Sequence, residues 1–308
     1  MSAPSLETKV GGLTLQNPVI AASGTFGYGL EYRPYLDLNR LGGLVTKGIS
    51  LEPRQGNPPP RIWETASGML NAIGLANVGL ERFIAEKLPA LAELDCAVIV
   101  NLYGEAVDEF AALARALDGR RGVAALELNV SCPNVKSGGM AFGVDPQAVA
   151  AVTRAVKAET GLPVWVKLTP NVTSPVAVAQ AAVQAGADAI SLINTLLGMA
   201  IDARGRRPRL ANVVGGLSGP AIKPVGLRMV WQVAQALPGV PVVGMGGIAS
   251  GEDAAEYLIA GASAVQVGTG NFQDPASCRR IAEELAQFCV ENQVARVSDL
   301  IGSLRPPA

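Results

Sequence analysis

Short apolar runs alternate along this chain with longer stretches in which apolar residues recur at helical spacing. The apolar runs are rich in Val, Ile, Leu and Ala and are almost uninterrupted, which is typical of parallel strands covered on both faces. We predict eight strands, at Val19–Ser23, Gly43–Gly48, Ala97–Leu102, Ala125–Val130, Val164–Leu168, Ala189–Asn194, Val242–Met245 and Ala264–Gly268.

The stretches between these strands predict helices. In the last of them, Ile281, Leu285 and Phe288 recur at positions that share one helix face. Asp145-Pro146 and Asp274-Pro275 have the residue types that cap a helix and begin its first turn. The predicted helices include Glu105–Leu117, Pro146–Glu159, Pro175–Ala185, Gly251–Ala260 and Pro275–Val290.

Eight strands with helices between them fit a (β/α)8, or TIM, barrel that forms one domain over residues 1–308. Lys9–Leu15, with Gly11-Gly12 inside it, predicts a small hairpin that closes the bottom of this barrel. Two connections are long. One runs from Leu51 to Asp95 and holds a proline-rich segment, and the other runs from Leu196 to Pro220 and is rich in arginine.

The charge balance narrows the classes of partner. The 308 residues are 49% hydrophobic and include 25 basic and 26 acidic side chains, for a formal net charge of −1. Nucleic acids and anionic membranes favour proteins with a basic excess, so we expect neither as the main partner. Neither a signal peptide nor an apolar run of about 18 residues is present, and we expect a cytoplasmic protein.

Cysteine and histidine usage restricts the chemistry. Four cysteines occur, at positions 96, 132, 278 and 289, and none forms a C-x-x-C pair, so we expect neither an iron–sulfur cluster nor a metal site in this chain. Cys96, Cys278 and Cys289 lie in apolar patterns that predict inert, buried thiols. The chain contains no histidine, so a general base must be another type of residue.

The residues that follow the predicted strands share a chemical character. In a TIM barrel the active site lies at the carboxyl ends of the strands. Here those ends carry amides, ammonium groups, hydroxyls, a thiol and glycines, which predicts a ring of hydrogen-bond donors for a planar anionic ligand. The ring comprises Ser23-Gly24, Thr46-Lys47-Gly48, Asn101, Asn129, Ser131-Cys132-Pro133, Lys167, Asn194-Thr195, Gly246-Gly247 and Gly268-Thr269.

The glycines after the last two strands predict a phosphate site. Barrels commonly bind phosphate there through backbone N–H groups, and glycine lets the backbone approach closely. Gly246-Gly247 and Gly268-Thr269 stand at these two places. The alternative for either pair alone is an ordinary turn.

Lys47 and Lys167 end apolar strands, where an unpaired ammonium is costly. Each therefore needs an anionic partner. A ligand carboxylate and the electron-rich edge of a reduced flavin are candidates, and a structural salt bridge is the alternative.

Cys132 is the best available base of this sequence. A thiol has a pKa of about 8.5 and can take a proton near neutral pH when lysines or desolvation tune it. Cys132 follows the fourth strand, and the segment from Ser137 to Gly143 predicts a mobile cover. Asn71, between the second and third strands, is a candidate amide clamp for a substrate with imide or amide groups.

Taken together, these segments resemble the class 1 dihydroorotate dehydrogenases, and most closely the type 1B catalytic subunit. The motifs that carry the resemblance are KGISLEPRQGNPPPRIWETASGMLNAIGLAN, NVSCPNVKSGGMAFG, VKLTP, INT, GGLSG, GMGGI and GTG, which occur in the expected order from Ser23 to Thr269. NxSCPN alone is shared with related flavoprotein dehydrogenases, whereas the whole set is specific.

The resemblance implies an FMN site and a dihydroorotate site. Cys132 and Lys47 would be catalytic: Cys132 takes a proton from C5 of dihydroorotate while hydride leaves C6 for FMN. FMN would be held by Ser23, Lys47, Gly48, Asn101, Asn129, Lys167, Ile193, Gly219, Gly246, Gly247, Gly268 and Thr269. Dihydroorotate would meet Lys47, Asn71, Ala72, Ile73, Gly74, Leu75, Asn129, Asn194 and Thr195.

The resemblance also implies a partner. Type 1B enzymes work with an electron-transfer subunit that holds FAD and a [2Fe–2S] cluster and passes electrons to NAD+, which implies a homodimeric core within a heterotetramer. The alternatives are a type 1A-like enzyme that uses fumarate, a flavin dehydrogenase of another pyrimidine, a Schiff-base aldolase with Lys167 or Lys47 as the amine, and a catalytically silent binding barrel.

Overall fold

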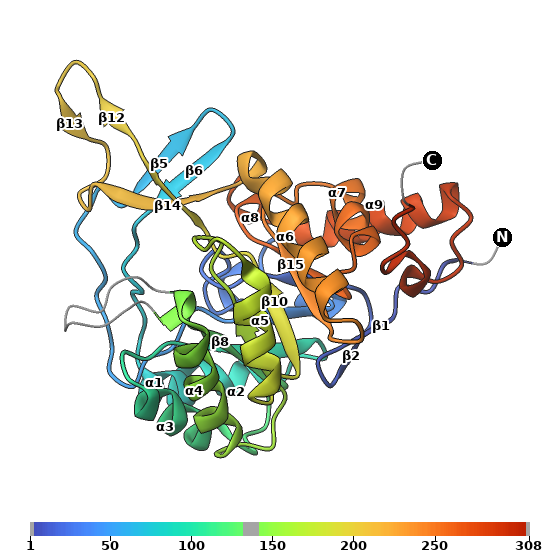
Figure 1. Cartoon of the computed structure of the whole chain (residues 1–308), viewed down its shortest axis with the longest axis horizontal. Coiled ribbons are helices and arrows are strands. Elements are labelled where there is room, and N and C mark those ends of the chain that lie inside the picture. Colours follow the sequence, from blue (N-terminus) through green and yellow to red (C-terminus); the bar gives the residue numbers. More distant parts are fainter. Residues whose placement is uncertain (1–2, 132–141, 306–308) are drawn as a thin grey trace.

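Eight parallel strands form a closed barrel in the computed structural model, which describes residues 3–131 and 142–305. Hydrogen-bonded neighbours follow the order β10-β15-β16-β3-β4-β7-β8-β9, and helices cover the outside of the ring (Figure 1). The predicted TIM barrel is therefore confirmed. The strands are β3 (Val19–Ala21), β4 (Gly43–Val45), β7 (Ala97–Leu102), β8 (Ala125–Asn129), β9 (Val164–Lys167), β10 (Ala189–Leu192), β15 (Val242–Met245) and β16 (Ala264–Val267).

Most of these strands end earlier than the sequence pattern predicted. Strand β4, for example, ends at Val45 rather than at Gly48, and β10 ends at Leu192 rather than at Asn194. Some of the extra residues still donate a backbone hydrogen bond to a neighbouring strand, as Thr46 N does to Ile99 O at 2.9 Å and Ile193 N to Met245 O at 3.1 Å. Beyond these bonds the chain leaves the barrel and forms the loops at its mouth.

Helices alternate with the strands. The five predicted helices are present, and α6 adds to them. Strands β4 and β7 are joined by a continuous helical segment made of α1, a π-turn (η3) and α2. The bounds are α1 (Leu80–Arg82), η3 (Phe83–Lys87), α2 (Leu88–Leu91), α3 (Val107–Leu117), α4 (Pro146–Lys157), α5 (Pro175–Gln184), α6 (Lys223–Ala236), α7 (Gly251–Ile259), α8 (Gly270–Gln273) and α9 (Ser277–Glu291).

One of the two predicted caps is wrong. The Asp145 side chain accepts a hydrogen bond from Gln147 N, 2.9 Å away, and caps α4 as expected. Asp274 accepts instead from Ala276 N at 2.9 Å and pairs with Arg280 at 2.9 Å. Because these contacts close a turn ahead of the helix, α9 begins at Ser277 rather than at Pro275.

The amino-terminal hairpin seals the bottom of the barrel. Strands β1 (Thr8–Val10) and β2 (Leu13–Leu15) are antiparallel, and Val10 and Leu15 are buried against the lowest inward-facing residues of the barrel strands. Trp165 fills this layer and donates a hydrogen bond from Nε1 to Gly11 O at 3.1 Å. The predicted closure of the barrel bottom is thus confirmed.

The two long connections pair with each other at the barrel mouth. They supply β5 (Ile62–Thr65), β6 (Gly68–Asn71), β11 (Leu196–Met199) and β14 (Val214–Ser218), which form an antiparallel sheet in the order β11-β14-β6-β5. The short hairpin of β12 (Ile201–Asp202) and β13 (Arg207–Pro208) projects beyond it at the upper left of Figure 1, away from both termini. The sequence pattern did not predict this sheet, because its strands are short and its partners lie far apart in the chain.

None of the helices in the described part of the chain is both long enough and apolar enough to cross a membrane.

We predict that Gly11→Ala destabilises the protein by about 2–5 kcal/mol, the combined cost of a left-handed backbone and an overpacked site. Gly11 has φ +49°, and an added Cβ would collide with the Trp165 indole and lie 2.8 Å from Ala189 Cβ. The measurement is the free energy of unfolding in urea.

Gly161→Ala is the matched control. No atom lies within 4 Å of a Cβ at Gly161, and its φ is not in the left-handed region, so this variant should unfold like the wild type. Equal stabilities of the two variants would contradict the role given to the hairpin contact.

Candidate active site

A cavity of about 840 Å³ opens at the carboxyl ends of the barrel strands. Its wall receives residues from the ends of all eight strands and from the four-stranded sheet above them. Every predicted site residue within the described ranges lies on this wall. They are Ser23, Lys47, Gly48, Asn71, Ala72, Ile73, Gly74, Leu75, Asn101, Asn129, Lys167, Ile193, Asn194, Thr195, Gly219, Gly246, Gly247, Gly268 and Thr269.

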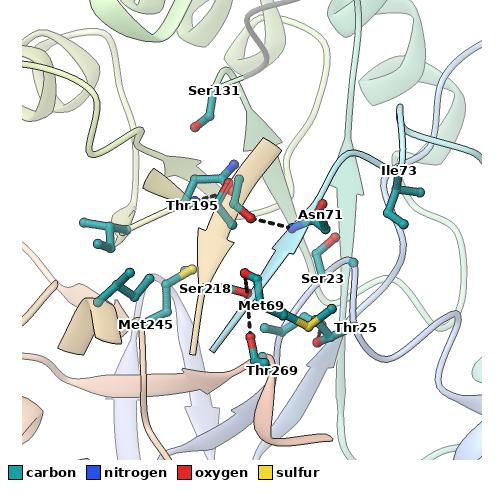
Figure 2. Close-up of a pocket in the computed structure, with 18 of the residues that line it drawn as sticks. Ser23, Thr25, Met69, Asn71, Ile73, Ser131, Thr195, Ser218, Met245 and Thr269 are labelled. Atoms are coloured by element: carbon teal, nitrogen blue, oxygen red, sulfur yellow. Dashed lines mark hydrogen bonds between the residues drawn. The ribbon is translucent and has the colours of Figure 1, made fainter. Parts of the chain in front are cut away.

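Cys132, the predicted base, lies outside the described residues, as does most of the predicted cover from Ser137 to Gly143. The residues on either side of the gap are described. Ser131 and Gly143 both line the cavity, and Ser131 Oγ donates to Lys167 O at 2.9 Å. Ser131 stands at the top of the view in Figure 2.

Glycine-rich turns after β14, β15 and β16 meet on one side of the cavity. Gly219 and Gly247 both have positive φ, and a Cβ on Gly247 would lie 2.9 Å from Gly219 O. Thr269 Oγ1 donates to Ser218 Oγ at 2.8 Å, which ties the β14 and β16 turns together (Figure 2). A side chain at Gly247 would therefore crowd the β14 turn.

The N–H groups of these turns are available to a ligand. Within the described residues, those of Gly247, Gly268 and Thr269 donate to no backbone or side-chain acceptor. Several converging N–H groups without acceptors favour a phosphate or another anion. The turns therefore have the geometry that the sequence pattern predicted for a phosphate site.

The two predicted lysines differ in their partners. Lys167 is buried, and its Nζ lies 3.7 Å from Glu127 Oε1. The structural salt bridge considered from sequence therefore exists for Lys167. At that distance the pair is not a hydrogen bond, and the ammonium donates to no acceptor among the described residues, which leaves its N–H groups for a ligand.

Lys47 is half-buried and has no carboxylate within 4.0 Å in the part of the chain that the structure describes. Burial lowers the pKa of its ammonium, and the charge of Arg61 lowers this pKa further, while Glu31 opposes both effects. A desolvated cation without a partner is suited to an anionic ligand.

Glu127 is the site residue that sequence reasoning missed. It is fully buried in the barrel, below the ring of strand ends. Its carboxylate accepts hydrogen bonds from Asn101 Nδ2 at 2.8 Å, Ser191 Oγ at 2.9 Å and Gln266 Nε2 at 2.7 Å. An acid within an otherwise apolar strand, two residues before Asn129 and so on the same face, was the available signal.

The amides on the other side of the cavity are held by one another. Asn194 Nδ2 donates to Asn129 Oδ1 at 3.3 Å, and Asn194 Oδ1 accepts from Thr195 N at 2.8 Å. Asn71, on β6, donates to Gly216 O at 3.3 Å. Figure 2 shows Asn71 and Thr195 facing the same space, from segments far apart in the chain. These contacts leave amide N–H groups free to meet a small polar molecule.

The other three thiols are unsuited to proton transfer. Cys96, Cys278 and Cys289 are buried, and burial raises the pKa of Cys96 and of Cys278 to about 12. Burial also raises the pKa of Cys289. The prediction that these three thiols are buried is confirmed. In the described ranges, no group of three or more Cys, Asp or Glu side chains could hold a metal ion.

The fold and the site together define a class: parallel β/α barrels with a cavity at the carboxyl ends of the strands that is lined by glycine-rich turns, lysines and amides. A family model described as dihydroorotate dehydrogenase matches residues 5–289. The chain belongs to this dihydroorotate dehydrogenase family.

Similar proteins narrow the group within the family. A protein from Citrifermentans bemidjiense named dihydroorotate dehydrogenase B (NAD(+)), catalytic subunit, is 57% identical over 304 residues, which are 99% of both chains. A protein of the same name from Geotalea uraniireducens is 58% identical, again over 99% of both chains. The resemblance inferred from the sequence motifs, including its type 1B subgroup, is confirmed.

A solved structure shares the fold. The DHODH of Eimeria tenella, crystallised in complex with ferulenol, superposes with a TM-score of 0.80 over 97% of this chain and 88% of that one. The two sequences are 24% identical, so this likeness concerns the barrel fold alone.

We predict that Cys96, Cys278 and Cys289 resist alkylation by iodoacetamide near neutral pH, because the thiolate is both inaccessible and scarce. Peptide mapping by mass spectrometry measures the modified fraction at each position, and the urea-unfolded protein, in which all four thiols should react, is the control. Rapid modification of Cys278 in the folded protein would contradict the burial described here.

Proposed function

We propose that this chain oxidises (S)-dihydroorotate to orotate, the redox step of de novo pyrimidine biosynthesis, as an NAD+-linked type 1B catalytic subunit. One observation carries the proposal. In the described part of this chain of the dihydroorotate dehydrogenase family, one cavity is lined both by a glycine cradle, the turns whose N–H groups at Gly247, Gly268 and Thr269 meet no acceptor, and by half-buried Lys47, which has no carboxylate partner. The names of the relatives, which are 55–58% identical, support the NAD+-linked subtype.

FMN is the cofactor of this proposal, and the cavity fits it. The free N–H groups of Gly247, Gly268 and Thr269 suit its phosphate. Asn101 Oδ1 and Gln266 Oε1 are buried without a partner in the described structure and suit the N–H edge of its ring system. When bound, FMN accepts the hydride that leaves C6 of dihydroorotate. The remaining FMN-binding residues of the proposal are Ser23, Lys47, Gly48, Asn129, Lys167, Ile193, Gly219 and Gly246.

Cys132 is the proposed base, which takes the proton from C5 of dihydroorotate. Three observations support it. The flanking residues Ser131 and Gly143 line the cavity, the other thiols are buried with raised pKa values, and the sequence contains no histidine.

Lys47 and the asparagines are the proposed substrate site. The Lys47 ammonium pairs with the carboxylate of dihydroorotate, while amide groups meet its ring carbonyl and N–H groups. Holding the substrate at several points supplies the alignment that proton and hydride removal need. The residues of this site are Asn71, Ala72, Ile73, Gly74, Leu75, Asn129, Asn194 and Thr195.

The proposal includes a partner subunit that holds FAD and a [2Fe–2S] cluster and passes the electrons to NAD+. Two catalytic chains and two such subunits form a cytoplasmic heterotetramer, in which residues 1–308 are one FMN-binding domain. Exposed apolar side chains gather on the sheet and hairpin above the barrel, which supports an interface between chains there. They are Ile62, Trp63, Leu197, Met199, Ile201, Val213 and Val214.

The other functions considered from sequence are not favoured. A Schiff-base aldolase needs an amine next to a carbonyl substrate, and one of the two candidate amines, Lys167, is paired with Glu127. For Lys47 as the amine, the names of the relatives give no support. A fumarate-linked reaction, another pyrimidine substrate or a silent barrel finds no support among the relatives, whose names specify an NAD+-linked dihydroorotate dehydrogenase.

The visible spectrum of the purified protein tests the function. We expect flavin absorption that bleaches when dihydroorotate is added without oxygen, and an iron-containing second chain that copurifies when both are expressed together. A colourless protein, or a flavin that dihydroorotate does not reduce, would refute the proposal.

We predict that Cys132→Ala binds FMN normally but loses at least about 100-fold in the rate of FMN reduction by dihydroorotate, the contribution of a general base. Cys132→Ser should keep weak activity that rises with pH, because a hydroxyl is a poorer base. Stopped-flow absorbance measures the rate, and Cys96→Ala, which removes a thiol remote from the cavity, is the control. Reduction at the wild-type rate in Cys132→Ala would exclude this role.

We predict that the affinity for orotate falls as the pH rises into the alkaline range. Because the pKa of Lys47 is lowered, its ammonium loses its proton at a lower pH than an ordinary lysine does. The attraction is fully present below that pKa and is lost above it, with the loss delayed by the bound anion, which raises the pKa again.

Orotate titrations of the holoenzyme across this pH range measure the effect. Lys47→Arg keeps its charge and should flatten the pH dependence, while Lys47→Met should weaken binding by about 10- to 100-fold at neutral pH. The exposed Lys9, changed to Met, is the control. A wild-type affinity that does not change with pH would refute this assignment.

A further inference from the structure

The carboxylate of Glu127 stands at the centre of the barrel interior. It binds side chains from β7, β10 and β16, and β16 lies opposite β8 in the ring. Gln266 therefore reaches across the barrel to Glu127. A buried carboxylate with three donors and a nearby ammonium has its charge well compensated, and the proposed reaction as described above makes no use of it.

This carboxylate determines how two amides are turned. An ionised carboxylate can only accept hydrogen bonds, so Asn101 and Gln266 must direct their NH2 groups toward Glu127. Their oxygens consequently face away from it. Asn101 Oδ1 and Gln266 Oε1 are among the buried side-chain atoms that lack a hydrogen-bond partner in the described structure, and both residues line the cavity.

Space next to one of these oxygens is kept open. A Cβ on Gly48 would lie 2.9 Å from Asn101 Oδ1, and Gly48 itself lines the cavity. Two buried acceptors that are locked in orientation call for a ligand with N–H donors, because an unmatched buried acceptor is costly.

Glu127 also opposes the charge of Lys167. Their charged atoms lie 3.7 Å apart in a fully buried setting, where screening by water is weak. The Lys167 ammonium attracts any negative charge that develops on a neighbouring ligand, and the Glu127 carboxylate reduces this attraction. The pair thus delivers less positive potential to the cavity than a lone lysine would.

We propose that Glu127 is a positioning residue that turns the Asn101 and Gln266 oxygens toward the ring edge of FMN and weakens the preference of the site for reduced FMN. This inference rests on the proposed function only in taking FMN as the occupant of the cavity. Reduced FMN carries more negative charge, so Glu127 lowers the tendency of the cofactor to keep electrons and favours their transfer to the next acceptor.

The test is the midpoint potential of bound FMN, titrated anaerobically with dithionite against a reference dye, with neither dihydroorotate nor turnover involved. Glu127→Gln keeps the shape of the side chain and removes its charge. We expect its affinity for reduced relative to oxidised FMN to rise about tenfold or more, which for a two-electron couple is an increase of about 30 mV or more.

Ser191→Ala is the matched control. It removes one hydrogen bond to the same carboxylate, keeps the charge and both amide contacts, and does not alter a residue that lines the cavity. It should lower stability and leave the potential unchanged. A purely structural role for Glu127 would lower stability in both variants and move the potential in neither, and that result would overturn the inference.

Glu127→Asp keeps the proposal testable if Glu127→Gln does not fold. The shorter side chain keeps the charge but withdraws it from Lys167, so the preference for reduced FMN should rise about threefold. An unchanged potential in a folded Glu127→Asp protein that binds FMN would also overturn the inference.

The failure of this inference can be told apart from failure of the proposed function. A wild-type protein that binds no FMN overturns both. A wild-type protein whose FMN is reduced by dihydroorotate, alongside a Glu127→Gln variant with the wild-type potential, overturns the inference alone.

Discussion

The closed ladder of backbone hydrogen bonds among eight parallel strands is the constraint on which the rest of this structure depends. Because all the strands run in one direction and the ring is complete, every strand ends at the same rim. Residues as far apart in the chain as Ser23 and Thr269 therefore face one cavity. The hairpin below the barrel and the Trp165 side chain fill the opposite end, so the barrel interior opens toward the cavity at the rim.

The two lysines of this site lie at different depths in the barrel and differ in their partners. Glu127 is fully buried among three hydrogen-bond donors, and Lys167 lies above it. Lys167 donates no hydrogen bond to Glu127, so its N–H groups can meet a ligand in the cavity. Lys47, nearer the opening, has no such partner in the described structure, and burial lowers the pKa of its ammonium. One cation is thus already paired within the protein, while the other has no anionic partner among the described residues.

The sheet above the mouth both covers the cavity and exposes apolar side chains. Strands β6 and β14 bring Asn71 and Ser218 over the cavity, while the outer strands and the projecting hairpin expose apolar side chains. The same sheet therefore lines the cavity and carries an exposed apolar surface. Contact of another chain with that surface would act close to the cavity, because strands of the same sheet line the cavity.

The sequence by itself determined the barrel, the ring of donors at its rim, the glycine cradle and the three buried thiols. Uninterrupted apolar runs, helical periodicity and residue type are local properties that can be seen in the sequence. In this fold, a residue that directly follows a strand lies at the rim of the barrel, so its place can be predicted from the sequence. Only the tertiary structure decided the rest. The four-stranded sheet depends on pairing between connections such as those of Asn71 and Gly216, and the partnership of Glu127 with Gln266 crosses the barrel. Neither leaves a periodic trace, because hydrogen bonds between distant segments are selected by the closure of the whole ring rather than by the neighbours of each residue in the chain.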